Sequence, residues 1–356
     1  MPDDLAGALA EAGVFRMLVP ARHGGLEVHP RRFVDVLRTL ARADGATGWV
    51  GMIGATTGSL AASVREDWAE RIWGADPAVI TCGVTAPLGR ARRVADGFRV
   101  TGRWPFGSAA RNARWICGGA MITDEAGEAR TDAAGNPEIV LMVLDAADVR
   151  CHDNWHVAGL CGTGSGDIEV EDAFVPDGRC APVGGRPRVD GPLYRFPLFG
   201  LLSLGVAAVS LGIGERAVEA LVDLAGAKKP AGSRRTLAER APVQADVARA
   251  EAGLRSARAL IGATVDDAWA AAEAGAPLTT EHRADLRLAA VNATWSAVDA
   301  VDRCYHAAGG TAIYADSPLQ RCLRDVHVTT QHVMVAPPVW ELAGRVRLGL
   351  SPGGPL

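Results

Sequence analysis

The sequence has 356 residues, of which 48% are hydrophobic and 22% are charged, and its formal net charge is −4. This is the composition of a soluble globular protein with a large core, and without a basic patch it argues against a nucleic acid as partner. Seven cysteines with neither a CxxC pair nor a secretory signal predict a reducing, cytoplasmic environment and no disulfide framework.

The chain changes character twice. Residues 1–75 have the three- and four-residue apolar spacing of helices, as in "DDLAGALAEAG" and "PRRFVDVLRTLARAD". Residues 76–185 contain short β-branched runs separated by Gly, Pro, Asn and Asp, which predict a β domain. Residues 186–356 are predicted to be helical again. The predicted organisation is therefore an N-terminal helical domain, a central β-barrel or sheet domain and a C-terminal four-helix bundle, an α+β fold.

Within the last region, the apolar run from Phe199 to Ile213 is too short for a membrane span, and its Gly and Ser residues suggest a tightly packed buried helix. Thr279 or Thr280 is a candidate cap for a later helix that ends at Gly309. We therefore expect no membrane partner.

Two segments of the β region have features of a binding site. In "GRWPFGSAARNARW", Trp104, Phe106 and Ser108 alternate, so in a strand they would share a face and could either stack on a planar cofactor or belong to the core. In "WHVAGLCGTGSGDIEV", Thr163 and Ser165 lie in a glycine-rich turn that either approaches the edge of a flat ligand or simply caps the strand.

Other cofactor signatures are absent from the sequence. No GxGxxG motif follows a strand and opens a helix, and no P-loop motif occurs, so no dinucleotide or nucleoside triphosphate site is predicted. "CHDNWHVAGLC" collects two cysteines and two histidines, but their spacing matches no structural zinc site, and no metal is predicted.

Taken in order, these pieces resemble the acyl-CoA dehydrogenase superfamily. "TGRWPFGS" is similar to the family's flavin-flanking strand, the segment from Trp155 to Pro176 to its flavin-edge segment, and "AAGGTAIYADSPLQRCLRDVH" to the entry into its C-terminal helix. The resemblance covers nearly the whole chain. It implies that a flavin is bound by the following residues: Trp104, Phe106, Ser108, Trp155, Thr163, Ser165, Gly309 and Gly310.

The stretch "RDVHVTTQHVM" separates the branches of this superfamily. Acyl-CoA dehydrogenases carry a glutamate base near this region, but here no Glu or Asp lies between Asp325 and Glu341. A histidine instead resembles the two-component flavin monooxygenases, which use reduced flavin and O2 to form a C4a-hydroperoxide and hydroxylate a small organic substrate. The resemblance implies reduced FMN or FAD delivered by a separate flavin reductase.

The resemblance also implies roles for individual residues. His332 would lie beside flavin C4a, where it would donate a proton to the peroxide if protonated near neutral pH and would still orient the peroxide if neutral. The Ser165 hydroxyl would lie near N5. His327 lies about 140° from His332 on an ideal helix and is expected to be structural. Arg235 and Gln244 either begin a solvated helix or reach a neighbouring subunit's flavin, which would require a homotetramer or homodimer.

Two alternatives stay open. One is a dehydrogenase or desaturase of the same fold with a displaced base. The other is a non-catalytic member that binds flavin or another ligand. Electron flow separates the two kinds of enzyme, because a dehydrogenase reduces its own flavin with substrate in the absence of O2.

Overall fold

The computed structural model describes residues 1–132, 135–183, 185–354 and 356, and the chain divides into two compact units. The β unit comprises residues 1–28, 50–156 and 161–194. The helical unit comprises residues 29–49, 157–160 and 195–356. The predicted order of helical, β and helical segments is confirmed, while the three domain boundaries stay predictions.

The β unit begins with short helices, which buried apolar side chains such as Phe15 and Trp73 pack into a core. The buried Arg16 guanidinium ties them together by donating to four main-chain carbonyls, those of Gly24, His23, Trp73 and Asp76. The helical segments are α1 (Asp3–Glu11), η1 (Val14–Arg16), η2 (Ala21–His23), η3 (Ser59–Ala62), α4 (Glu66–Ala69) and η4 (Glu70–Gly74).

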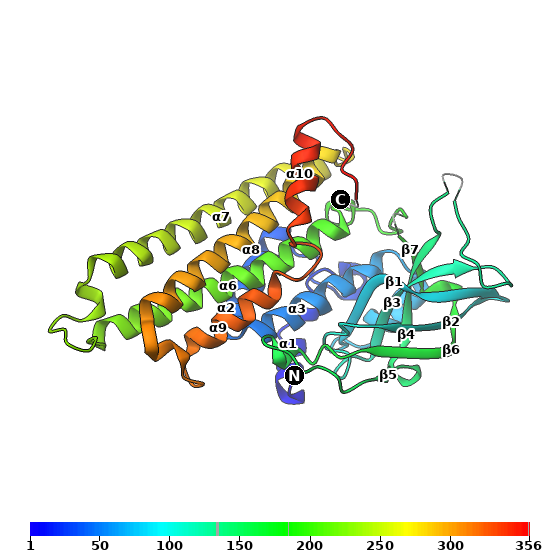
Figure 1. The fold of residues 1–356 in the computed structure, drawn as a ribbon. Coiled ribbons are helices and arrows are strands. Elements are labelled where there is room, and N and C mark those ends of the chain that lie inside the picture. Colours follow the sequence, from blue (N-terminus) through cyan, green and yellow to red (C-terminus); the bar gives the residue numbers. More distant parts are fainter. Residues whose placement is uncertain (133–134, 184, 355) are drawn as a thin grey trace. The chain divides into compact units, whose positions relative to one another are not determined.

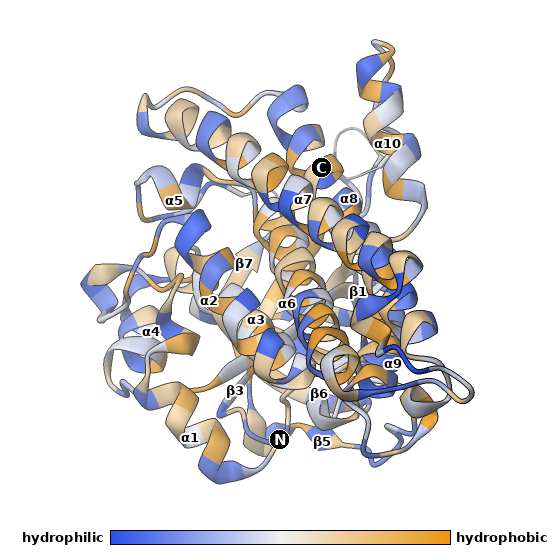
Figure 2. Cartoon of the chain, turned by 90° about the vertical axis from the view of Figure 1, so that its left-hand side faces the viewer, coloured by the Kyte–Doolittle hydropathy of each residue, from blue (hydrophilic) through white to orange (hydrophobic). Residues whose placement is uncertain are grey.

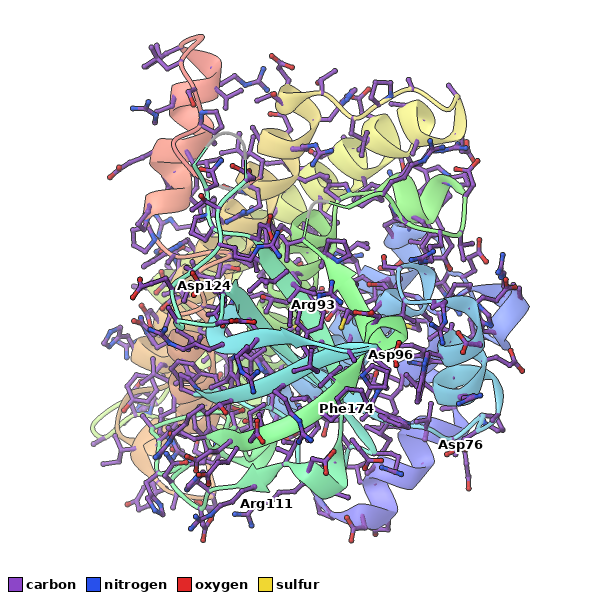
Figure 3. All side chains as sticks on the ribbon, turned by 90° about the vertical axis from the view of Figure 1, so that its right-hand side faces the viewer. Asp76, Arg93, Asp96, Arg111, Asp124 and Phe174 are labelled. Atoms are coloured by element: carbon purple, nitrogen blue, oxygen red, sulfur yellow. The ribbon has the colours of Figure 1, made fainter. Side chains whose placement is uncertain are left out.

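A mixed seven-stranded sheet follows, with the strand order β5-β6-β2-β1-β3-β4-β7. The pair β1–β3 is parallel, and the other neighbours are antiparallel. Asp96, with a φ of 60°, lies in the tight turn between β1 and β2; Figure 3 labels it together with Arg93 on β1 and Phe174 on β6. The strands are β1 (Thr81–Val94), β2 (Gly97–Trp104), β3 (Trp115–Thr123), β4 (Ile139–Asp145), β5 (Arg150–Cys151), β6 (Ile168–Pro176) and β7 (Cys180–Pro182), with η5 (Ala146–Asp148), η6 (Cys161–Thr163) and η7 (Asp177–Arg179) between them.

In the helical unit, three long helices run side by side, with α8 packed against both α6 and α7 (Figure 1). The predicted cap is confirmed, because the Thr279 side chain accepts from the His282 N–H and the helix ends at Gly309. The helices are α2 (Pro30–Ala43), α5 (Pro192–Arg195), α6 (Leu198–Ala227), η8 (Leu237–Glu239), α7 (Ala241–Glu273), α8 (Thr280–Ala308), η9 (Gly309–Ile313), α9 (Pro318–Thr329) and α10 (Pro338–Arg347). Two helices have residues in both units. They are α3 (Gly45–Gly58), which is divided after Trp49, and α5, which is divided after Tyr194.

The apolar helix α6 is the centre of the helical unit. By length and composition it could cross a membrane, but 83% of its most apolar window is buried inside the protein, as in a core helix. Figure 2 shows hydrophobic residues along its length. At Gly212 an added Cβ would lie 2.3 Å from the Arg38 carbonyl, so α2 can approach α6 only because this residue is glycine. The buried, tightly packed helix expected from the sequence is confirmed.

Candidate active site

The side chain of Trp104 belongs to the core of the sheet. It is 0% exposed, its Nε1 donates to the Gly119 carbonyl at 2.8 Å, and its ring lies over Gly89, Gly102 and Gly118. The indole is therefore enclosed by residues of the β unit and is not presented to a ligand. Of the two positions considered for Trp104, stacking on a cofactor and packing in the core, the structure shows the core.

The expected common face of Trp104, Phe106 and Ser108 is wrong, because strand β2 ends at Trp104. Phe106 has a φ of 67°, and this left-handed turn breaks the alternation of a strand. Phe106 is 65% exposed, whereas Ser108 is 3% exposed. The Phe106 ring meets Trp155 edge to face at 6.3 Å, so two of the predicted flavin-binding aromatic residues do lie together.

The turn from Phe106 to Ala109 is bound to the glycine-rich turn that contains Thr163 and Ser165. The Gly107 N–H donates to the Gly166 carbonyl at 2.9 Å, and the Ala109 N–H donates to the Thr163 carbonyl at 3.2 Å. Side chains larger than glycine would prevent this, since an added Cβ at Gly107 would lie 2.7 Å from the Ile168 side chain. Two segments that are far apart in the sequence thus form one site.

Three hydroxyl groups meet in this site. Ser165 Oγ lies 2.7 Å from Ser108 Oγ and 2.6 Å from Thr163 Oγ1, and all three side chains are buried. They carry three protons but form two hydrogen bonds with each other, so at least one hydroxyl proton is not used within the cluster. Beside the cluster, Gly164 has a φ of 56° and open space within 4 Å of an added Cβ. Polar hydrogen-bonding groups beside open space suit the edge of a flavin ring.

The Arg-Asp pair of "RDVH" holds the short loop of residues 157–160 in the helical unit. Asp325 Oδ1 accepts from the Leu160 N–H at 2.6 Å, and Arg324 Nη1 donates to the Ala158 carbonyl at 3.2 Å. An added Cβ at Gly159 would lie 2.3 Å from the Arg324 carbonyl, so this contact needs glycine. The pair therefore anchors the residues that immediately precede the glycine-rich turn in the chain.

His332 lies beyond the end of α9, in a turn of the helical unit. Its Nδ1 accepts from the Met334 N–H at 3.2 Å, and its ring meets Trp49 edge to face at 5.5 Å. Burial, aided by the positive charge of Arg287, lowers the pKa of His332 to about 4. The imidazole is therefore neutral at pH 7, and because Nδ1 accepts, the proton is on Nε2. Of the two forms considered for His332, the lowered pKa favours the neutral one.

His327, five residues earlier, lies on α9 with its side chain half-exposed. Its Nε2 lies 2.9 Å from Asp302 Oδ1 on α8. The prediction that His327 has a structural rather than a catalytic position agrees with this surface contact.

The remaining predicted site residues lie at the surface of the helical unit. Arg235 and Gln244 are both exposed, and Gln244 Nε2 donates to the Ala238 carbonyl at 2.9 Å. Gly309 and Gly310 are exposed at the end of α8, and Gly309 has a φ of 59°. Their role in cofactor binding stays a prediction.

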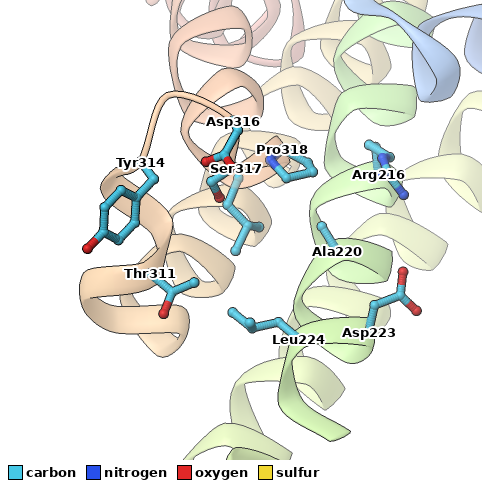
Figure 4. A pocket seen from close by; sticks show the side chains of 10 residues that line it. Arg216, Ala220, Asp223, Leu224, Thr311, Tyr314, Asp316, Ser317 and Pro318 are labelled. Atoms are coloured by element: carbon cyan, nitrogen blue, oxygen red, sulfur yellow. The ribbon is translucent and has the colours of Figure 1, made fainter. Parts of the chain in front are cut away.

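A surface cavity of about 460 Å³ lies next to this glycine turn (Figure 4). One wall is formed by α6, with Arg216 and Asp223. The other is formed by η9 with Thr311, by the link after it with Tyr314 and Asp316, and by the start of α9. Both walls belong to the helical unit. Apolar side chains make up most of the exposed lining, with charged groups on the α6 wall and charged and hydroxyl groups on the opposite wall.

A helical bundle, a mixed sheet and a hydroxyl-lined glycine turn are the parts of a flavoprotein with the acyl-CoA dehydrogenase fold. The family Acyl-CoA dehydrogenase, C-terminal domain, matches residues 204–337. Over 98% of its length the chain is 35% identical to the indole-3-acetate monooxygenase of Pseudomonas putida, of which it covers 87%. It is also 32% identical to the flavin-dependent monooxygenase, oxygenase subunit HsaA, of Rhodococcus jostii, over 93% of this chain and 87% of that protein.

Among solved structures, the 3-HSA hydroxylase from Rhodococcus sp. RHA1 matches with a TM-score of 0.89 at 29% identity, over 98% of this chain and 90% of that one. The chain belongs to the two-component flavin-dependent monooxygenases of the acyl-CoA dehydrogenase superfamily. It is an oxygenase component that uses reduced FMN or FAD together with O2, and a flavin reductase is its partner.

Three residues that contact His332 or its turn were not identified from the sequence. Trp49 on α3 meets the His332 ring, and Arg287 and Trp295 on α8 donate to carbonyls of the turn that contains His332. They lie far from "TTQHVM" in the sequence, and helix periodicity marks each of them only as part of an ordinary helix. No local signal could have identified them.

Proposed function

We propose that this oxygenase component hydroxylates a small aromatic compound. The relatives named above include an indole-3-acetate monooxygenase, and the indole ring of that substrate supports an aromatic compound here. The observation that carries the oxygenase chemistry is that the stretch between Asp325 and Glu341 contains His332 and no carboxylate. An α-proton cannot be removed here by a glutamate, whereas an Nε2–H group can donate a hydrogen bond to reacting oxygen.

Reduced flavin supplies the two electrons with which one atom of O2 enters the substrate and the other leaves as water. The residues of this chain have to bind the ring, exclude water and direct protons. We assign Ser165 to the flavin N5 edge and His332 to the C4a edge.

The hydroxyl cluster supports this assignment of Ser165. If Ser108 and Thr163 both donate to Ser165 Oγ, its two lone pairs are used and its own proton must point away from the cluster. The two incoming hydrogen bonds also polarise the Ser165 O–H and strengthen its donation. A donor held in this way beside flavin N5 would oppose the proton movements that release H2O2 before the substrate reacts.

We further propose a homotetramer or homodimer in which Arg235 and Gln244 reach a neighbouring subunit's flavin. The exposure of both side chains is compatible with this role. Light scattering after size exclusion would test the assembly. Arg235→Ala should then weaken flavin binding without changing the subunit fold, and a monomer with full flavin affinity would contradict the proposal.

The function is tested by combining the purified protein with a flavin reductase, NADH, FAD or FMN, and 18O2. Indole-3-acetate and a series of phenols serve as candidate substrates. A hydroxylated product carrying one 18O atom is the expected result. Anaerobic bleaching of bound flavin by a substrate, without a reductase, would instead indicate the dehydrogenase alternative.

A further inference from the structure

The turn that contains His332 is held by two side chains of α8. Arg287 Nη2 donates to the Val333 carbonyl at 3.5 Å, and Trp295 Nε1 donates to the Val335 carbonyl at 3.2 Å. Residues eight positions apart lie about 80° apart around a helix, so both donors project from the same side of α8. The two contacted carbonyls lie one and three residues after His332, so α8 sets the path of the main chain at this point.

His332 is in turn tied to this main chain through both its backbone and its ring. Its carbonyl accepts from the Val335 N–H at 2.9 Å and from the Ala336 N–H at 3.0 Å. Its Nδ1 accepts from the Met334 N–H, which is part of the same turn. A displacement of the turn must therefore change the direction in which Nε2 presents its proton.

Arg287 also controls the electrostatics of the ring. Arg287 is 3% exposed, and burial lowers its pKa to about 10, so it remains cationic at pH 7. Like charges in a buried region disfavour each other, which helps to keep the imidazole neutral. The neighbouring elements do not oppose this effect of Arg287 on the pKa of His332. Trp49 on α3 is uncharged, and Glu341 on α10 is exposed. On α9, Asp325 is bonded to Leu160 and His327 to Asp302.

We propose that Arg287 and Trp295 are positioning residues that determine where, and in which tautomer, His332 presents its ring. The importance of this for catalysis rests on the proposed role of His332, but the positioning itself can be measured without any turnover. Trp295 acts through geometry alone. Arg287 acts through both geometry and charge.

The charge effect is tested by titrating the protein labelled with 15N-histidine, with the His332 signal assigned by its loss in His332→Gln. In Arg287→Met the pKa of His332 should rise above about 4 yet stay below 6.5, because burial remains. Arg287→Lys keeps the charge, and Trp295→Phe removes the N–H donor and part of the ring without altering any charge, so both should leave the titration midpoint unchanged. A midpoint in Arg287→Met equal to that of the wild-type protein would overturn the electrostatic part.

The geometric effect is tested by amide hydrogen exchange of the peptide covering residues 330–337. Trp295→Phe and Arg287→Lys should each speed exchange of the Val335 and Ala336 amides, while leaving exchange of α9 unchanged. If neither variant changes the exchange of this peptide, α8 does not hold the turn. Should these measurements succeed while no substrate is hydroxylated, the proposed substrate class is wrong and the positioning stands.

Discussion

Replacing Asp325 should measure how strongly the helical unit holds the loop of residues 157–160. Asp325 is 8% exposed, and its carboxylate accepts from the Leu160 N–H at 2.6 Å. A buried hydrogen bond to a charged group contributes about 1.5–3 kcal/mol, so Asp325→Ala should lower the free energy of unfolding by about this amount. Asp325→Asn keeps an acceptor oxygen of the same shape and should lose only about 0.5–1.5 kcal/mol.

The difference in free energy of unfolding between wild type and Asp325→Asn should also depend on pH. Burial raises the pKa of Asp325, and the Leu160 N–H partly opposes this rise. In the window between the usual value of 3.8 and the raised pKa, the folded protein binds a proton that the unfolded chain has released. Wild type should therefore lose stability relative to Asp325→Asn as the pH rises through this window.

A second substitution tests the same loop without altering any charge. In Gly159→Ala the new Cβ would lie 2.3 Å from the Arg324 carbonyl, so the loop must move or the helix must yield. Gly253→Ala, on α7 with open space around its added Cβ, is the control, and should be neutral or stabilising by up to about 1 kcal/mol.

The assay is urea unfolding followed by circular dichroism, combined with hydrogen exchange of residues 157–166. Gly159→Ala and Asp325→Ala should both unfold at lower urea and expose this peptide to exchange. If both variants match wild type in both measurements, the Arg-Asp pair does not anchor the loop, and the reasoning from its hydrogen bonds is refuted.

Further predictions concern the candidate site. Ser165→Ala should raise the H2O2 released per NADH consumed. A lost hydrogen bond of ~1–3 kcal/mol corresponds to roughly a 5- to 150-fold change in the rate of H2O2 release. The control Ser203→Ala removes a buried hydroxyl from α6 and should leave H2O2 release unchanged. His332→Asn should slow the oxygen reaction measured by stopped flow, whereas an equal loss in His327→Asn would argue against a special role for His332. The pKa of His332 is about 4 in the folded protein, so between pH 6.5 and 4 the unfolded chain binds a proton that the folded protein does not. Wild type should therefore lose stability relative to His332→Asn as the pH falls through this range, and urea unfolding at several pH values measures this. Gly310→Ala should fold normally, because nothing in the subunit lies within 4 Å of the added Cβ. Weaker flavin binding in a fluorescence titration would support contact of Gly310 with the cofactor, and unchanged binding would exclude it.

The secondary structure and the superfamily were predictable because both depend on local patterns. The β-branched runs became β1 to β4 and β6, and the Thr279 cap and the Gly309 end of α8 are local backbone chemistry. The order of the flavin-associated segments carried the superfamily assignment.

The candidate site was predictable only in part, because its geometry depends on contacts between distant segments. The left-handed backbone at Phe106 ends an alternation that seemed to continue from Trp104 to Ser108. The sequence left the protonation state of His332 open, since its pKa is lowered by burial and by Arg287, which lies 45 residues earlier in the chain. No pattern in one sequence reports the burial of a side chain by helices that come from elsewhere.

Residues 157–160 belong to the helical unit, although the residues before and after them belong to the β unit. This limits how the protein can be divided into fragments. Residues of the helical unit come from three separate stretches, and those of the β unit come from three others. No single cut therefore yields both units intact: a fragment starting at Arg195 lacks α2 and the loop held by Asp325. Truncations, split reporters and domain exchange between relatives should accordingly keep all three stretches of a unit together.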